Sequence, residues 1–95
     1  MSMKWADAKP EQYEAMRKSV NWEGDVPKGA VFHVAGFDEQ GIRVTDIWES
    51  AEDMQHFVET RLMDGARAAN VEGEPVVDVF PVHAVFTPGL TKLQG

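Results

Sequence analysis

A histidine, an aspartate and a tryptophan lie close together in the stretch Ala30–Trp48, which reads AVFHVAGFDEQGIRVTDIW. A carboxylate that accepts a hydrogen bond from one ring nitrogen of a histidine orients the imidazole and favours its charged form. The second ring nitrogen then stays free for chemistry. His33 and Asp46 are therefore candidates for a general base and its orienting acid, and Trp48 would offer a flat face to an aromatic substrate.

These three residues meet only if the stretch folds as a β-hairpin in one register. Residues 30–37 and 42–48 are rich in β-branched and aromatic residues, which predicts two strands, and DEQG at 38–41 predicts the turn. With a four-residue turn, His33 faces Asp46 on a face that is otherwise apolar, so we expect this face to point toward the helices. A shift by one residue would separate the pair. The same register predicts three further pairs on this face: Phe37–Ile42, Ala35–Val44 and Val31–Trp48.

Other aromatic and histidine side chains are weaker candidates for substrate binding. Tyr13 would hold an aromatic ring together with Trp48. Trp22 is the large apolar group of the loop 21–29, and it either plugs the end of the first helix or forms a wall of a pocket. His83, on the predicted last strand, is either a ligand contact, a satisfied histidine or a residue at a dimer interface.

We expect no metal and no cofactor. The chain contains no cysteine, which excludes disulfides, thiolate catalysis and thiolate metal sites. The three histidines show no spacing that would gather them, so a metal site of His33, Asp46 and His83 has little support. The sequence also contains no glycine-rich phosphate loop and no nucleophile elbow.

A strand and a helix are predicted before the hairpin. Residues 2–5 form a short candidate strand. Pro10 suits the first position of a helix, and an apolar stripe at helical spacing predicts a helix over residues 10–20. The stripe consists of Tyr13, Met16 and Val20.

A second helix is predicted after the hairpin. Ser50 and Asp53 have the spacing of a capping box, and an apolar stripe of Met54, Phe57, Val58 and Leu62 follows. Gly65 weakens the helix, so we expect a kink or a second short helical piece over residues 64–69. Asn70 suits a left-handed C-cap.

The last predicted strand, residues 76–86, reads VVDVFPVHAVF and is apolar on both of its faces. Such a strand is buried on both faces, and Pro81 places it at a sheet edge or a bulge. The resulting order, β-α-β-β-α-β, predicts an α+β, ferredoxin-like domain with an antiparallel four-stranded sheet and two helices on one face. The open face, with Phe32, Val34 and Ile47, would be an exposed apolar patch, which predicts a homodimer with sheet against sheet.

The size and charge of the chain limit its organisation and its partners. Its 95 residues predict a single domain over 1–87 and a loose tail over 88–95, and so small a domain gains stability from association. The net charge of −7, without a basic cluster, argues against nucleic acids and anionic membranes. The lack of cysteine, of a signal core and of a membrane-spanning run favours a cytoplasmic protein.

The chain resembles the dimeric α/β-barrel superfamily, in particular its antibiotic-biosynthesis-monooxygenase-like bacterial branch. Trp48-Glu49-Ser50 ends a strand and leads into the acidic and apolar start of a helix at residues 53–57, as in that superfamily. The resemblance covers most of residues 3–87. The segments that carry it are PEQY at 10–13, NWEGD at 21–25, FHVAGFD at 32–38, RVTDIWES at 43–50, RLM at 61–63 and FPVHAVF at 80–86.

The resemblance implies a homodimer whose two sheets form a barrel, with a cavity between sheet and helices in each subunit. In that superfamily the cavity serves cofactor-free oxygenation of polycyclic aromatics, haem degradation or lactone isomerisation, and Trp48 matches a tryptophan that lines it in the oxygenases. The chain departs from the family in two places. Haem-degrading members have a histidine late in the second helix, and residues 63–70 contain none; oxygenases often have an asparagine on the first strand, and residues 2–5 contain none. These departures argue against haem and weaken the expectation of oxygenase activity.

Two functions remain open from the sequence. The first is a cofactor-independent oxygenase-like or isomerase-like enzyme, in which His33, oriented by Asp46, takes a proton from an apolar or aromatic phenol or enol. The second is a non-catalytic dimer that binds a small ligand or acts as an accessory protein, in which His33 and Asp46 only satisfy each other.

Overall fold

The computed structural model describes residues 1–89, so most of the predicted tail at 88–95 lies outside the described residues. The elements follow in the order β1 (Ser2–Ala6), α1 (Pro10–Val20), β2 (Ala30–Asp38), β3 (Gly41–Trp48), α2 (Ala51–Phe57), a π-helical turn η1 (Val58–Leu62), α3 (Met63–Ala68) and β4 (Val76–Asp78).

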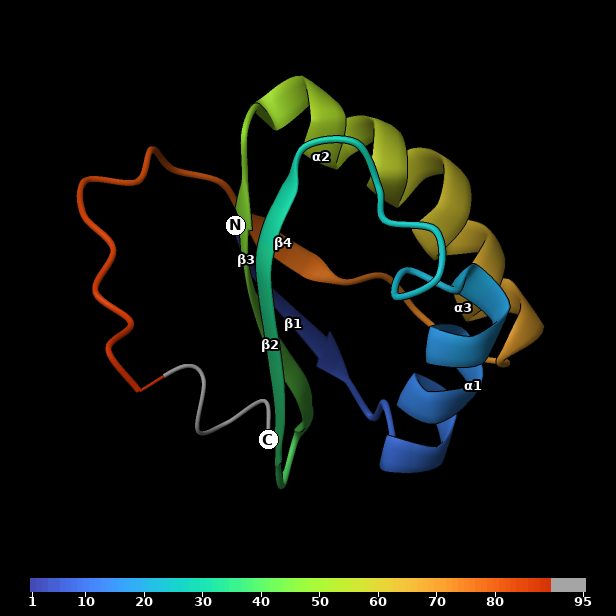
Figure 1. Cartoon of the computed structure of the whole chain (residues 1–95). Coiled ribbons are helices and arrows are strands. Elements are labelled where there is room, and N and C mark those ends of the chain that lie inside the picture. Colours follow the sequence, from blue (N-terminus) through green and yellow to red (C-terminus); the bar gives the residue numbers. More distant parts are fainter. Residues whose placement is uncertain (90–95) are drawn as a thin grey trace.

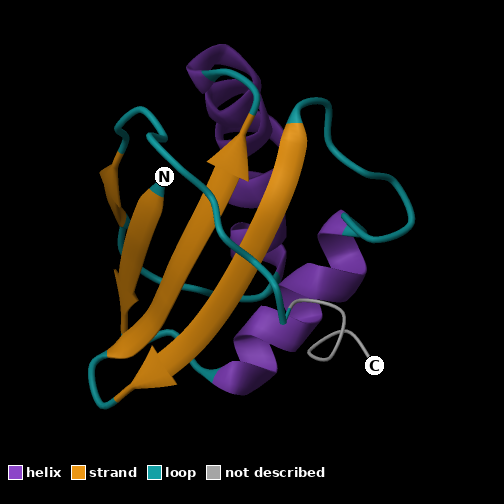
Figure 2. Ribbon diagram, turned by 60° about the vertical axis from the view of Figure 1, so that its left-hand side comes forward, coloured by secondary structure: helices purple, strands orange, loops and turns teal. Residues whose placement is uncertain are grey.

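The four strands form one antiparallel sheet in the order β2-β3-β1-β4. The helices lie on one side of this sheet, and the chain that follows β4 runs on the opposite side (Figures 1 and 2). The predicted α+β class and βαββαβ order are confirmed, and the strand order is compatible with the ferredoxin-like arrangement.

The hairpin has the predicted register over most of its length: His33 faces Asp46, and the pairs Ala35–Val44 and Phe37–Ile42 are present. The turn is shorter than predicted, because Asp38 pairs with Gly41 and only residues 39–40 connect the strands. A two-residue and a four-residue connection with the same centre give the same register. The predicted pairing of His33 with Asp46 is therefore confirmed although the predicted turn length is wrong.

The far end of the hairpin differs from the prediction. The register shifts between Ala30 and Phe32, so Trp48 faces Ala30 and not Val31. A bulge of this kind leaves one residue unpaired and bends the strand. The side chain of the unpaired Val31 is 60% exposed.

The core lies between the sheet and the helices. Met16 and Val20 of the predicted α1 stripe are buried there, while Tyr13 is half-buried. At Gly65 a Cβ atom would meet a methyl group of Val20, so the absence of a side chain lets α3 approach α1 closely. The buried apolar residues are Met1, Met3, Trp5, Met16, Val20, Ile42, Val44, Met54, Phe57, Leu62 and Ala66.

The second helical segment, formed by α2, η1 and α3 over residues 51–68, begins where predicted, since the Ser50 hydroxyl accepts a hydrogen bond of 3.1 Å from the N–H of Asp53. Of the predicted capping box only this bond is present among the described residues. A separate helical piece, α3, is also present near the expected residues 64–69, and Asn70 has a left-handed φ of 59°. The irregularity itself lies earlier than Gly65, in the π-helical turn Val58–Leu62. Gly65 therefore serves the packing against Val20 and does not mark the irregular turn.

The prediction of a last strand over residues 76–86 is wrong beyond Asp78. Register places Asp78 opposite Ser2, so a longer β4 would extend past the start of β1 and lack a partner. Residues 79–86 form no strand and are exposed, contrary to the expectation of burial on both faces. We call residues 79–86 the arm.

Candidate functional site

A cavity of about 230 Å³ lies between the sheet and the helices. Its walls are mostly apolar and come from β1, β2, β3, both helical segments and the loop 21–29. Met3, Val44 and Trp48 are on the sheet side of the lining, and Met16 and Leu62 are on the helix side. Its polar side chains are Gln12, Tyr13, His33 and Asp46.

Three of these polar side chains form a hydrogen-bonded chain. Nδ1 of His33 lies 2.6 Å from Oδ1 of Asp46, and the Tyr13 hydroxyl lies 2.8 Å from Nε2 of the same ring. Nε1 of Trp48 donates to Oδ2 of Asp46 over 3.2 Å. The carboxyl group of Asp46, which is only 7% exposed, is thus held by one partner on each oxygen.

The donors and acceptors of these hydrogen bonds can be assigned from the chemistry of the three side chains. A carboxylate only accepts, so with a neutral ring the Nδ1–H of His33 donates to Asp46 and Nε2 accepts from the Tyr13 hydroxyl. The hydroxyl oxygen of Tyr13 then keeps free acceptor capacity. Burial raises the pKa of the Tyr13 phenol above its ordinary value of 10.0, so the phenol is protonated at neutral pH.

Two aromatic rings lie near the imidazole of His33, whose side chain is 35% exposed. The rings of Tyr13 and His33 are nearly parallel, at 5° and 6.1 Å between centroids, and Trp22 lies 5.4 Å from His33. Phe37 contacts Tyr13 edge-on. On the other side of the site, Trp48 packs against Phe57 at 5.3 Å.

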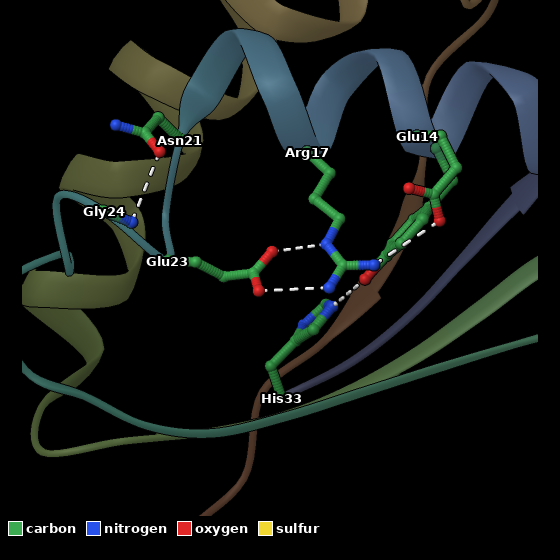
Figure 3. Close-up of polar contacts among 7 residues, drawn as sticks. Glu14, Arg17, Asn21, Glu23, Gly24 and His33 are labelled. Carbon is green, nitrogen blue, oxygen red and sulfur yellow. Dashed lines mark hydrogen bonds and ion pairs between the residues drawn. The ribbon is translucent and has the colours of Figure 1, made fainter. Parts of the chain in front are cut away.

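The loop that carries Trp22 is also tied to α1. Glu23 forms an ion pair with Arg17, whose guanidinium also lies 3.5 Å from Glu14, and Figure 3 shows this cluster beside His33. The side chain of Asn21 accepts a hydrogen bond from the N–H of Gly24. These contacts hold the start of the loop next to the imidazole.

The structure brings five of the six predicted site residues to one place. His33, Asp46, Trp48, Tyr13 and Trp22 all line the cavity. His83 lies in the exposed arm and does not line the cavity, and the third histidine, His56, is exposed on α2.

Sequence reasoning missed two contacts of the site. It expected a free second nitrogen on His33, but that nitrogen is occupied by Tyr13. It also missed the hydrogen bond from Trp48 to Asp46. The hydrogen bond between Tyr13 and His33 joins α1 to β2 across 20 residues, and no local sequence pattern predicts a contact of this kind.

Comparisons with known proteins add no family. No family model matches the chain, and no curated protein or solved structure matches it either. Within residues 1–89, no group of three or more His, Asp or Glu side chains could hold a metal ion. None of the helices described is long and apolar enough to cross a membrane.

Proposed function

We propose that the protein binds a small apolar or aromatic molecule in its cavity and catalyses proton abstraction from it, as a cofactor-independent enzyme of the oxygenase-like or isomerase-like kind. The observation that carries this proposal is the chain Asp46–His33–Tyr13 at the wall of an apolar cavity. A base that is oriented by a buried carboxylate and faces an apolar cavity is an arrangement suited to general-base catalysis.

The order of hydrogen bonds suggests how the proton moves. The substrate proton passes to the oxygen of Tyr13 while the phenolic proton passes to Nε2 of His33. The electron pair of the broken C–H bond forms the double bond of an enolate, and the carbonyl oxygen takes the negative charge. The new imidazolium is stabilised by Asp46, and the enolate oxygen or carbon later recovers a proton.

The cavity volume supports a small substrate. Pockets for drug-sized ligands hold roughly 300–1,000 Å³, and this cavity is smaller, at about 230 Å³. A neutral molecule of one or two rings suits this volume and the mostly apolar lining. The resemblance to the dimeric α/β-barrel superfamily agrees with such a cavity between sheet and helices.

A probe of this class tests the proposal. β-Tetralone is an uncharged ketone of two fused rings whose α-protons exchange for deuterium through its enolate. We expect the protein to accelerate this exchange with saturation, and we expect His33→Ala to lower the maximal rate at least about tenfold. His56→Ala, which changes an exposed histidine of α2, is the matched control and retains the wild-type rate. Exchange no faster than in buffer, or equally fast in the His33 variant, contradicts catalysis.

A non-catalytic ligand-binding or accessory protein is the second candidate. One observation favours it: both oxygens of Asp46 and both nitrogens of His33 have partners within the chain. A network satisfied in this way stabilises the fold without a substrate. Saturable binding of β-tetralone without deuterium exchange would select this function.

We also propose that the protein is a homodimer in which the arm of one copy packs on the sheet of the other. Val79, Phe80, Val82 and Val85 of the arm are between 49% and 57% exposed, and Val34 on the open sheet face is 49% exposed. The arm leaves the sheet on this open side (Figure 2). The arm has a strand-forming composition, and within residues 1–89 no strand pairs with the outer edge of β2, so a second copy of the chain is the fitting occupant.

The oligomeric state tests the association. Sedimentation velocity of the full chain is expected to give a dimer, and Phe80→Asp combined with Val82→Asp is expected to give a folded monomer. Lys18→Asp, a change of charge at an exposed position of α1 on the helix side of the sheet, is the control and stays dimeric. A wild-type monomer at high micromolar concentration contradicts the proposal.

A further inference from the structure

The loop 21–29 forms one wall of the cavity without any regular secondary structure. Trp22, Val26 and Pro27 line the cavity from this loop. Within the loop the backbone is held by only a few bonds, such as Asp25 N–H to the carbonyl of Asn21 at 2.8 Å. What fixes the loop to the rest of the molecule therefore decides whether this wall stays in place.

Arg61 on the second helical segment holds the middle of this loop. Its Nη2 donates to the backbone carbonyl of Val20 over 2.8 Å and to that of Asp25 over 2.7 Å. Val20 is the last residue of α1, where backbone carbonyls lack helical partners and a positive charge is favourable. One guanidinium thus joins the end of α1 to the middle of the loop.

The same side chain also contacts the opposite wall of the cavity. The Arg61 guanidinium lies 5.6 Å over the ring of Phe57, which in turn packs against Trp48. Arg61 belongs to the π-helical turn η1, whose residues Val58 and Leu62 line the cavity. Single π-helical turns inside α-helices are frequent at functional sites.

We propose that Arg61 is a positioning residue that holds the loop 21–29 closed over the cavity and so controls the entry and exit of the ligand. The control of ligand exchange rests on the proposed function, whereas the closure of the loop is independent of it. Without the guanidinium, the carbonyls of Val20 and Asp25 lose their shared donor. The loop then opens more often.

The two ends of the loop have their own contacts, since Trp22 packs against Tyr13 and the carbonyl of Gly29 accepts from the N–H of Glu49 over 2.8 Å, but the ion pairs of the loop are weaker than the Arg61 contact. Arg17 and Glu23 form their pair at the surface, with side chains 45% and 59% exposed. Lys28 approaches Asp53 only to 3.9 Å, and its side chain is 91% exposed. Exposed ion pairs contribute little, while a charged donor to backbone carbonyls, with Arg61 only 28% exposed, contributes more.

Amide hydrogen exchange, followed by NMR on the ligand-free protein, tests the closure. We expect Arg61→Gln to speed exchange of the Asp25 amide at least about tenfold, with no change in the β3 amides of Val44 and Asp46. Arg61→Lys keeps the charge and one donor, so a smaller increase is expected. The lysine variant also serves if the glutamine variant does not fold.

Two control variants separate the carbonyl bridge from surface charge. Asp25→Asn removes the carboxylate that lies 3.8 Å from Arg61 but keeps the backbone carbonyl, so it leaves exchange unchanged. Arg67→Gln removes an exposed arginine of α3 and also has no effect. Unchanged exchange at Asp25 in the Arg61 variants, or an equal rise throughout the chain, overturns the proposal.

Ligand kinetics test the second half of the proposal. In Arg61→Gln, the association and dissociation rates of β-tetralone, followed by quenching of tryptophan fluorescence, both rise about fivefold or more, and the dissociation constant changes less than about twofold. Rates equal to those of the wild type overturn the control of access. If β-tetralone does not bind the wild-type protein, both the proposed function and the proposed control of ligand access are wrong. Hydrogen exchange still tests whether Arg61 holds the loop closed.

Discussion

The Tyr13 hydroxyl lies 2.8 Å from Nε2 of His33, and this contact makes the phenol the end of the chain that begins at Asp46. A tyrosine in this position changes the chemistry expected of the site. In the reaction proposed above, the imidazole would act on a bound molecule through the phenolic oxygen, and the buried carboxylate would stabilise the charge that the ring receives.

Tyr13 is the only tyrosine of the chain, so its ionisation can be followed directly by the ultraviolet absorbance of tyrosinate. Because burial raises the pKa of its phenol, we expect a midpoint above 10.0 in the folded protein. The unfolded chain then binds fewer protons than the folded one between the two pKa values. The contribution of Tyr13 to the free energy of unfolding is therefore fully present below the pKa of the unfolded chain. It is lost as the pH rises through the folded pKa.

The alkaline loss of stability should depend on this one residue. In Tyr13→Phe the free energy of unfolding, measured with urea, is expected to decrease less between about pH 9 and about pH 11. Apart from Tyr13, the two proteins carry the same titratable groups, so the difference between them reports the phenol. An identical pH dependence in the two proteins, or a tyrosinate midpoint below 10.0, would contradict the burial of the phenol.

Asp46→Asn should destabilise the protein by about 1–3 kcal/mol. The asparagine keeps the shape but replaces one acceptor oxygen by an NH₂ donor, which then faces the N–H of His33 or of Trp48. Urea unfolding monitored by circular dichroism measures the change. Asp64→Asn, at an exposed position that pairs only with Arg67 on the same helix, is the control and should change stability by less than about 0.5 kcal/mol.

Gly65→Ala should destabilise the protein by about 1–3 kcal/mol, although alanine is the better helix former. The added methyl group would collide with the side chain of Val20, which packs on this glycine. The double variant Val20→Ala/Gly65→Ala is expected to recover part of the loss relative to the sum of the two single variants. Strict additivity in this thermodynamic cycle would refute the close approach of α1 and α3.

Ser50→Ala should cost about 1 kcal/mol of stability, because the hydroxyl caps the first turn of α2 by accepting from the N–H of Asp53. Ser19→Ala, within α1, is the comparison and should be neutral or slightly stabilising, since alanine favours a helix interior. Thermal melts followed by circular dichroism measure both. Equal effects of the two changes would show that the cap does not stabilise α2.

Local patterns were sufficient to predict most of the elements. Pro10 and the apolar stripe marked α1, and Ser50 marked the start of α2, because capping and periodicity depend on neighbours a few residues apart. The pairing of His33 with Asp46 also followed from local features. The turn and the alternation of side chains fix a hairpin register without help from the rest of the fold.

The tertiary structure decided what joins segments that are distant in the chain. The hydrogen bond between Tyr13 and His33, and the bridge from Arg61 to Val20 and Asp25, depend on how α1, the loop and the second helical segment pack. Neither propensity nor periodicity contains that information, because both describe one segment at a time.

Strand β4 also shows what the sequence determines and what depends on the tertiary structure. The sequence by itself determined that residues 76–86 have the composition of a buried strand. Only the tertiary structure decided that the strand stops at Asp78, since a strand needs a neighbour to pair with and the register places Asp78 opposite the start of β1. Strand composition is a property of the residues, whereas strand formation requires a partner that the single chain does not supply.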